Sequence, residues 1–280
     1  SLTSVEAVVN LGGGTDTVTY AGSTSPVSVN LAAGSASGFS SITGVESVTG
    51  GSGNDTLIGN SAANTLSGGA GNDSLTGTGN DALIGGAGDD TYNAVSGDTI
   101  TEAAGAGIDT VFTSSAVFTL ANNVDNLTYT GAGGFTGTGN AQDNVITGGD
   151  GSDILSGAGG NDQLFGGASD DNLSGGAGND ILTGGAGNDI MDGGAGTDTF
   201  IFGPGFGADI INNFDANLTG GQDLLDISGL GITADNFATS VVIADLGANM
   251  QVTIDGNTIT LVGVNGVGAN TITIQDFLLA

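Results

Sequence analysis

The chain has 280 residues, of which 30 are Asp or Glu and none is Lys, Arg or His, so its formal net charge is −30. No carboxylate can therefore form an ion pair with a basic side chain, and the basic donors that contact nucleic-acid phosphates are missing. The absence of Cys excludes disulfides, and no apolar run reaches the ~18 residues of a membrane span. Two alternatives remain for the acidic residues: a solvated, salt-adapted surface, or the binding of an external cation.

Glycine and hydrophobic residues define the class of fold. The 56 Gly residues are accompanied by only 2 Pro, which excludes collagen, because its triple helix needs Gly-X-Y triplets rich in Pro. The net charge alone would suit a disordered chain. However, hydrophobic residues make up 38% of the chain and recur at fixed intervals, which favours an ordered repeat fold.

Residues 1–49 are predicted to form β-rich lead-in coils. Val27, Val29 and Leu31 alternate with polar residues, which is typical of a strand. The segment from Gly12 to Asp16 is a partial copy of the turn found in the arrays below. A metal ligand at Asp16 and a plain strand-and-loop coil without metal remain alternatives.

Residues 50–93 form a first array of units that are nine residues long. The units read GGSGNDTLI, GNSAANTLS, GGAGNDSLT, GTGNDALI and GGAGDDTYN. The second unit has Asn64 at position six, and the fourth unit is one residue short. The acids at position six are Asp55, Asp73, Asp81 and Asp90. The repeat is thus clear but irregular.

Residues 94–147 are predicted to continue the same solenoid as wider coils with few metals. The segment GAGIDTVF contains another partial turn, in which Asp109 is either a ligand or a simple turn acid. Asn144 stands at position six directly before the next array.

Residues 148–201 repeat in strict nines. The units are GGDGSDILS, GAGGNDQLF, GGASDDNLS, GGAGNDILT, GGAGNDIMD and GGAGTDTFI, with Asp at position six and an apolar residue at position eight throughout. The position-six acids are Asp153, Asp162, Asp171, Asp180, Asp189 and Asp198. A surface that only needs charge would not place acids at a fixed interval, so the spacing favours metal binding.

Residues 202–280 are predicted to be a C-terminal cap. A turn-like segment ends at Asp209, a short helix is expected to start near Thr233, and strands are expected at 240–245, 250–255, 257–264 and 270–275. Asp255 and Gly256 with the following Asn are a strong hairpin signal. The acids of this tail fall outside the repeat and are expected at the surface. A cap also has a physical reason, because every solenoid must cover its last open coil.

The arrays resemble the RTX (repeats-in-toxin) family, whose GGxGxDxUx unit is a calcium-binding β-helix repeat. The resemblance implies an all-β parallel β-roll in which six residues make a turn, three make a strand and two units make one coil. It also implies several Ca2+ ions, held by the position-six carboxylates of both arrays and Asp209 together with turn carbonyls. The turn glycines carried over as ligands are Gly51, Gly53, Gly69, Gly71, Gly86, Gly88, Gly149, Gly151, Gly176, Gly178, Gly185 and Gly187. Gly at positions one, two and four allows the positive φ of a tight turn.

Electrostatics supports this assignment. Coils that stack ~4.8 Å apart would place Asp residues 18 apart on the same edge. Unit charges about 5 Å apart repel by roughly 3 kcal/mol at an effective dielectric constant near 20. Several such pairs would remove a stability of ~5–15 kcal/mol, whereas a divalent cation between them reverses the sign of the interaction.

The resemblance also bears on function. RTX proteins are exported by type I secretion with an uncleaved C-terminal signal, so the chain is expected to be secreted, to partner the export machinery and to fold in extracellular calcium. Without His, Cys, Lys or Arg, the common nucleophile and zinc systems are unavailable; a carboxylate pair remains formally open, and we expect no enzyme activity. We expect a self-associating structural component of a surface layer, filament or matrix. The alternative is the C-terminal export-and-folding module of a larger enzyme or toxin; an adhesin or ice-binding solenoid would need a Thr-rich face that the arrays lack.

Overall fold

The protein is described by a computed structural model that covers residues 8–217, 221–264 and 271–280. This part of the chain consists almost entirely of short strands and turns, with one four-residue α-helix and two 3₁₀ turns. It separates into two compact units. Unit 1 comprises residues 1–115 and 120–128, and unit 2 comprises residues 116–119 and 129–280.

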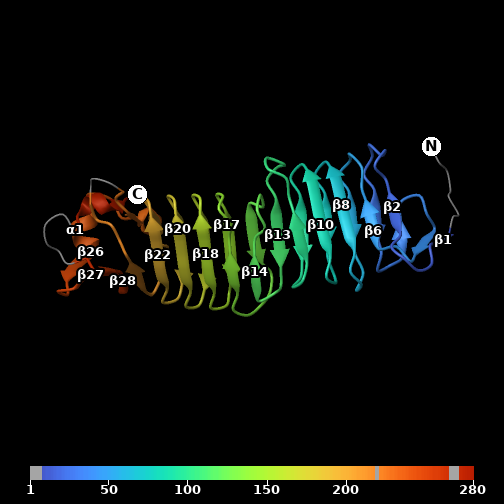
Figure 1. The fold of residues 1–280 in the computed structure, drawn as a ribbon. Helices are drawn as coiled ribbons and strands as arrows, with labels where there is room; N and C mark the ends of the chain where they lie inside the picture. The colour runs from blue at the N-terminus through green and yellow to red at the C-terminus, as the bar shows by residue number, and fades with distance from the viewer. Residues whose placement is uncertain (1–7, 218–220, 265–270) are drawn as a thin grey trace. The chain divides into compact units, whose positions relative to one another are not determined.

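Unit 1 is a β-solenoid whose strands from β6 to β13 alternate between two parallel sheets, while β3 and β4 form an antiparallel pair within one of them (Figure 1). One sheet has the order β12-β10-β8-β6-β2, and the other runs β4-β3-β7-β9-β11-β13-β15; β1 pairs with β5 separately. The strands are β1 (Val8–Asn10), β2 (Thr17–Thr19), β3 (Ser28–Asn30), β4 (Ser35–Ala36), β5 (Ser41–Thr43), β6 (Ser47–Thr49), β7 (Thr56–Ile58), β8 (Thr65–Ala70), β9 (Ser74–Thr76), β10 (Ala82–Ala87), β11 (Thr91–Ala94), β12 (Thr99–Thr101), β13 (Thr110–Thr113) and β15 (Asn126–Tyr129).

Unit 2 repeats this arrangement with the sheets β14-β16-β18-β20-β22-β24-β28-β27-β26 and β17-β19-β21-β23-β25-β29. Its solenoid strands are β14 (Val117–Thr119), β16 (Thr136–Thr138), β17 (Val145–Gly149), β18 (Ile154–Gly159), β19 (Gln163–Ala168), β20 (Asn172–Ala177), β21 (Ile181–Ala186), β22 (Ile190–Ala195), β23 (Thr199–Ile201), β24 (Ala208–Asn212) and β25 (Leu224–Asp226). The predicted all-β parallel solenoid is confirmed. Its five-part division into lead-in, arrays, intervening coils and cap stays a prediction.

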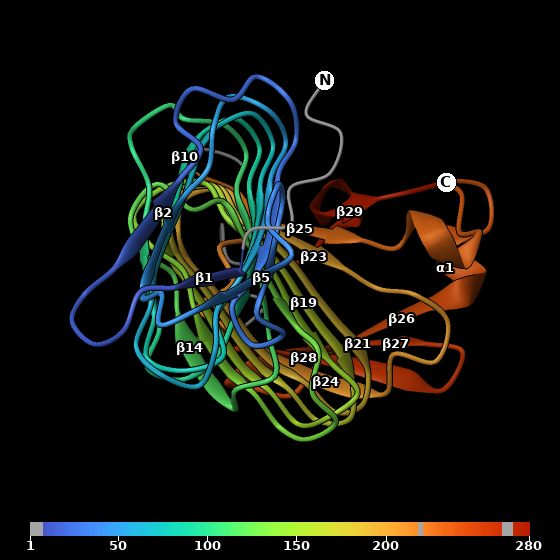
Figure 2. The same cartoon turned by 90° about the vertical axis from the view of Figure 1, so that its right-hand side faces the viewer.

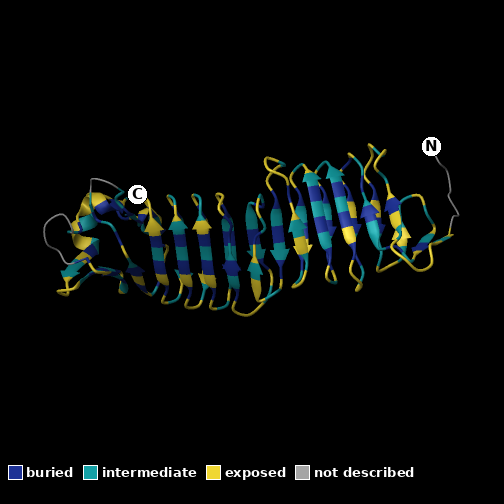
Figure 3. Ribbon diagram, in the orientation of Figure 1, coloured by how far each residue is buried: buried dark blue, intermediate teal, exposed yellow. Residues whose placement is uncertain are grey.

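The core of each unit is a stack of the apolar residues at position eight. In unit 2, Leu155 pairs with Leu173, which pairs with Met191, and the opposite sheet continues the pattern. All three side chains are at most 1% exposed. Figure 3 shows the result as bands of buried residues that alternate with exposed ones along the strands of this sheet. Each coil contributes two such residues, so only stacked coils can bury them.

The strands of the strict array are longer than the three residues that the family resemblance implied. β18 to β22 each have six residues, because pairing continues through positions one to three of the following unit. The tight turn is therefore confined to positions four to six. Backbone pairing between successive turns explains the extension, and the turn segment itself is hydrogen-bonded to the coil above and below.

The C-terminal region departs from the solenoid. β26 (Val241–Asp245), β27 (Asn249–Ile254) and β28 (Asn257–Val262) form an antiparallel meander, and β28 also pairs in parallel with β24. The remaining elements are η1 (Ser228–Leu230), α1 (Phe237–Ser240), η2 (Ile274–Asp276) and β29 (Phe277–Leu278). Figure 2 shows α1 beside the meander. β28 thus continues one sheet beyond β24, and β29 continues the other beyond β25.

The hairpin prediction is confirmed, because Asp255 and Gly256 both have positive φ between β27 and β28. Three other predictions for the tail are corrected. The helix begins at Phe237 with Asn236 as its N-cap, since the Thr233 amide instead donates to the Asn236 side chain. Residues 271–275 contain a 3₁₀ turn and no strand, while residue 270 lies outside the described residues. Two of the tail acids, Asp223 and Asp276, are buried and do not lie at the surface.

Candidate calcium centres

The position-six acids lie at the point where each turn enters a strand, and the stacking of coils places them in rows. In unit 2 one row continues from the strict array to Asp209, and the other continues to Asp223. Every position-six Asp of the strict array is buried, with an exposed fraction of at most 3%. The chain therefore removes a column of carboxylates from water on each edge of the unit 2 solenoid.

A hydrogen bond joins each acid to the next coil. The backbone N–H of Asp153 donates to Oδ1 of Asp171 at 2.8 Å, and the N–H of Asp171 donates to Oδ1 of Asp189 at 2.9 Å. On the other edge Asp162 and Asp180 are joined in the same way at 2.8 Å. One oxygen of each carboxylate is thus fixed by the backbone, which leaves Oδ2 to face the turn.

The second oxygen of these carboxylates is unsatisfied. Among the described acids of the rows, nine have an Oδ2 atom that is buried and has no hydrogen-bond partner. They are Asp73, Asp90, Asp109, Asp153, Asp162, Asp171, Asp180, Asp189 and Asp198. Burial of an ionised carboxylate without a partner costs several kcal/mol. Such a row needs either protons or a cation.

The pKa values also show that burial disfavours the ionised form of these carboxyl groups. Burial raises the pKa of Asp171 and of Asp209 from 3.8 to about 7, and a neighbouring acid of the row adds to the rise. Burial likewise raises the pKa of Asp162 and of Asp180 to about 6. In each case the backbone N–H bond to the carboxylate opposes the shift without cancelling it. Without a cation, these groups would titrate near neutral pH.

The predicted turn glycines fall into two groups that differ in backbone φ. Of the predicted set, nine have positive φ and stand at positions two and four: Gly69, Gly71, Gly86, Gly88, Gly149, Gly176, Gly178, Gly185 and Gly187. Their carbonyls point along the stack, since a Cβ added at Gly185 would overlap the carbonyl oxygen one coil earlier. Gly51, Gly53 and Gly151 lack positive φ and also approach the backbone of a neighbouring coil.

Position one needs glycine for a reason other than the expected backbone freedom. None of these glycines, such as Gly148 or Gly166, has positive φ. Instead, a Cβ at Gly148 would overlap Oδ2 of Asp153 and lie 2.8 Å from the carbonyl oxygen of Gly166 in the next coil. The missing side chain leaves a cradle lined by a carboxylate oxygen and a carbonyl oxygen. Hard oxygen ligands of this kind are those that Ca2+ prefers.

The first array is less uniform, as its sequence predicted. The short fourth unit keeps Asp81 in the row, but its Oδ2 accepts backbone hydrogen bonds from Thr78 and Gly79 at 2.8 and 3.2 Å. Oδ2 of Asp55 accepts one from Gly51 at 2.6 Å. These two acids are therefore weaker candidates for a cation than Asp73 or those of the strict array.

Sequence reasoning missed or left open several members of the rows. Asp98 and Asp223 accept the same interstrand hydrogen bond from Asp81 and Asp198, at 2.9 Å in both cases. Asp109, which was left open, accepts it from Asp90 at 2.8 Å. One signal would have found all three. Each acid is followed two residues later by a buried or half-buried apolar residue of a strand, as in the strict units.

The oxygen-rich cradles, the unsatisfied carboxylates and the stacked coils together define a calcium-binding β-solenoid. The family model described as the RTX calcium-binding nonapeptide repeat (4 copies) matches residues 42–75, 75–100, 130–164, 138–173 and 165–200. The chain accordingly contains RTX nonapeptide repeats, as predicted, and repeats of this kind bind Ca2+. Proteins with such repeats are typically secreted.

Solved structures with similarity to the chain include two subunits, AlgE6R3 and AlgE6R2, of the mannuronan C5-epimerase of Azotobacter vinelandii. Both are 28% identical; the first covers 50% of this chain and 80% of its own at a TM-score of 0.28, and the second covers 52% and 91% at 0.29. The extracellular lipase LipA of Serratia marcescens is 18% identical over 84% of this chain, at a TM-score of 0.31. The chain spans only 40% of that lipase. No curated protein matches the chain.

None of the helices in the described part of the chain has the length and hydrophobicity of a membrane span.

Proposed function

We propose that the protein is a secreted structural component that stays unfolded during type I export, folds when it meets extracellular calcium, and then self-associates. Calcium-driven folding after export is supported by the row of buried, unsatisfied carboxylates in a chain without a single basic residue. Extracellular calcium modules bind with dissociation constants of about 10⁻⁴–10⁻³ M, so such sites fill only outside the cell. Metal binding energy then becomes folding energy.

A row of exposed side chains on one sheet of unit 2 supports self-association. Position seven of neighbouring strands carries Val117, Ile154, Ile190 and Ile210, which are 37–65% exposed. A polar residue separates Val117 from Ile154 and Ile154 from Ile190, whereas Ile190 pairs directly with Ile210. Exposed apolar side chains that gather on one face are typical of a protein-interaction surface. A second copy of the chain could present the same row, and calcium could bridge the acidic surfaces.

Calcium-dependent assembly is the test of this proposal. Size-exclusion chromatography with light scattering should give large species or filaments in millimolar calcium and an expanded monomer after calcium removal. Replacing Ile154, Ile190 and Ile210 together by Thr should abolish the assembly while leaving the β circular dichroism unchanged. The matched control replaces Gln163 by Thr at position seven of the other sheet. A monodisperse monomer at every protein concentration in calcium would refute self-association.

The second candidate is an export-and-folding module of a larger enzyme or toxin. The same calcium-driven folding would serve it, so folding measurements do not separate the two. The gene sequence that encodes the region N-terminal to Ser1 would separate the two candidate functions, because a His-bearing catalytic domain there would assign the chain to this class.

A further inference from the structure

Glu102 occupies an unusual place in the repeat geometry of unit 1. In the pairing of β10 with β12, Ile84 is opposite Thr101, so Glu102 stands next to Gly85, in the position that the repeats reserve for glycine. The repeat turn from Gly85 to Asp90 is followed one coil later by a turn from Glu102 to Asp109 that is two residues longer. The longer turn provides the room for a side chain that an ordinary turn excludes.

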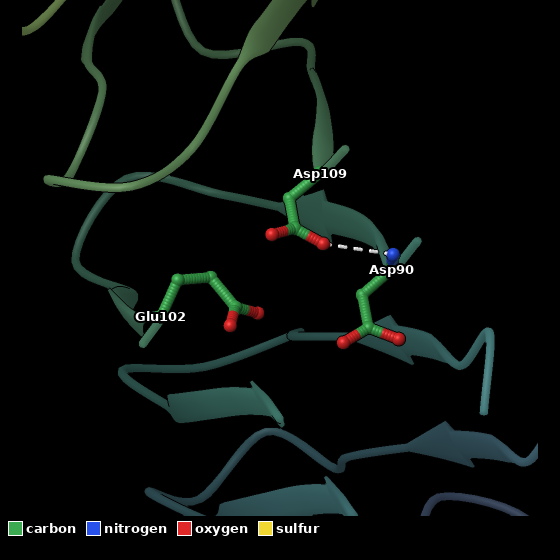
Figure 4. Close-up of side chains that lie close together, drawn as sticks. All are labelled: Asp90, Glu102 and Asp109. Carbon is green, nitrogen blue, oxygen red and sulfur yellow. Dashed lines mark hydrogen bonds between the residues drawn. The ribbon is translucent and has the colours of Figure 1, made fainter. Parts of the chain in front are cut away.

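The extra side chain brings a third carboxylate to the row. One carboxylate oxygen each of Asp90, Glu102 and Asp109 lie within 4.8 Å of one another, and all three residues are buried (Figure 4). The backbone N–H of Asp90 donates to Oδ1 of Asp109 at 2.8 Å, which holds the two coils in register. Figure 4 shows the Glu102 carboxylate turned toward the two aspartates.

The hydrogen bonds of the cluster leave oxygen atoms unused. Tyr92, at the core position of β11, is fully buried and donates its hydroxyl to Oε1 of Glu102, while Oε2 accepts a long 3.3 Å bond from the Ala103 amide. Oδ2 of Asp90 and Oδ2 of Asp109 are buried without any hydrogen-bond partner. Those two aspartates are at most 1% exposed, so solvent does not compensate them.

We propose that Asp90, Glu102 and Asp109 form a calcium site that differs from the repeat sites by a carboxylate from outside the nonapeptide pattern. Ordinary stacked turns contribute aspartates and carbonyls, whereas here Glu102 adds a further full negative charge. Calcium affinity rises with the number of charged ligands and with the rigidity of the site. Tyr92 supplies the rigidity by fixing Glu102. This site is expected to bind calcium before the repeat sites and to stabilise the stacking of the last unit of the first array on the next coil.

The competing explanation is a metal-free cluster in which hydrogen bonds alone hold the Glu102 carboxylate beside Tyr92. The two explanations predict different results when the charge of Glu102 is removed. A metal site loses calcium affinity, whereas the calcium affinity of a chain with a metal-free cluster does not change.

The experiment uses Tb3+ as a calcium probe, because tyrosine sensitises its emission at short range. The chain has three Tyr and no Trp, so excitation in the tyrosine band reports only on Tyr20, Tyr92 and Tyr129. Wild-type protein titrated with Tb3+ should show sensitised emission that saturates at about one equivalent, and the first equivalents of calcium should compete for it. The Tyr92→Phe variant should lose this early emission.

The Glu102→Gln variant should bind the first Tb3+ and the first Ca2+ at least about tenfold more weakly, in emission and in calorimetric titration. The matched control is Asp89→Asn, which removes one charge from the neighbouring exposed residue and keeps an oxygen for the Ile108 amide bond. It should weaken the first site far less than Glu102→Gln does, because Asp89 is exposed and is not one of the clustered carboxylates. Early emission that persists in Tyr92→Phe, or unchanged affinity in Glu102→Gln, would overturn the proposal. Both variants should still assemble at saturating calcium if the wild type does, so failure of this site is distinguishable from failure of the proposed function.

Discussion

Replacing Asp171 by Asn should change the stability of the protein in opposite directions with and without calcium. Asp171 lies in the middle of its row, is 3% exposed, and has an Oδ2 without a hydrogen-bond partner. Asn keeps an oxygen for the 2.8 Å bond from the Asp153 amide. The turn accepts Asn at this position, because Asn64 and Asn144 occupy it in wild-type coils.

The magnitude follows from the raised pKa. Burial raises the pKa of Asp171 from 3.8 to about 7, and each pKa unit corresponds to about 1.4 kcal/mol. The ionised form at about pH 8 therefore destabilises the calcium-free fold by about 4 kcal/mol, and Asn removes that penalty. In saturating calcium the variant instead loses a charged ligand between two coils, a loss of about 3–5 kcal/mol by analogy with a broken buried ion pair.

The assay is chemical denaturation followed by circular dichroism, in calcium and after calcium removal. The matched control is Asp170→Asn, an exposed neighbour whose Oδ1 accepts the Asn188 amide at 2.8 Å, a bond that Asn can also accept. The control should change stability by less than about 0.5 kcal/mol in either condition. A change of the same sign in both conditions for Asp171→Asn would refute the reasoning.

Three further predictions concern the turns and the rows. Ala158 and Ser169 have φ of 79° and 73° where most units have Gly, so replacing either by Gly should stabilise the calcium-loaded protein by about 1 kcal/mol in denaturant titrations; no gain would show that these turns are unstrained. In calcium-free protein, the folded carboxyls have raised pKa values of about 6–7 against 3.8, so the fold binds more protons than the unfolded chain, and stability should fall as pH rises from about 4 to 7. Thermal melts at several pH values measure this, and stability that rises with pH would contradict it. Asn64→Asp should restore a charged ligand and raise the calcium stoichiometry seen by calorimetry, while an unchanged stoichiometry would show that the Asn coil already binds.

The strict array could be predicted closely because its information is local and repeated. The interval of nine residues identifies the turn, the acid at position six and the core residue at position eight, and all six position-eight side chains are buried. The hairpin at Asp255 and Gly256 was predictable for the same reason, since a two-residue turn is specified by its own residues.

The remaining members of the rows could not be placed from the repeat interval alone. Asp189 and Asp209 are 20 residues apart, and Asp198 and Asp223 are 25 apart, yet each pair is joined by the same 2.9 Å hydrogen bond. Loops of different length leave the strand register unchanged, because pairing between strands sets the stack. An interval rule alone therefore loses these acids once a loop lengthens; Asp209 was predicted from its turn-like segment, and Asp223 was missed.

The periodic residues of the chain are sufficient to specify an all-β solenoid, a calcium-binding class and the position of most acids, because each nonapeptide encodes its own turn and strand. Only the stacked coils decide which oxygens remain unsatisfied, and why position one excludes a side chain. They also bring Glu102 to Asp90 and Asp109, a meeting that depends on strand register between coils and on a turn two residues longer than the repeat. A cation site needs ligands converging from different coils, and that convergence is a property of the tertiary structure.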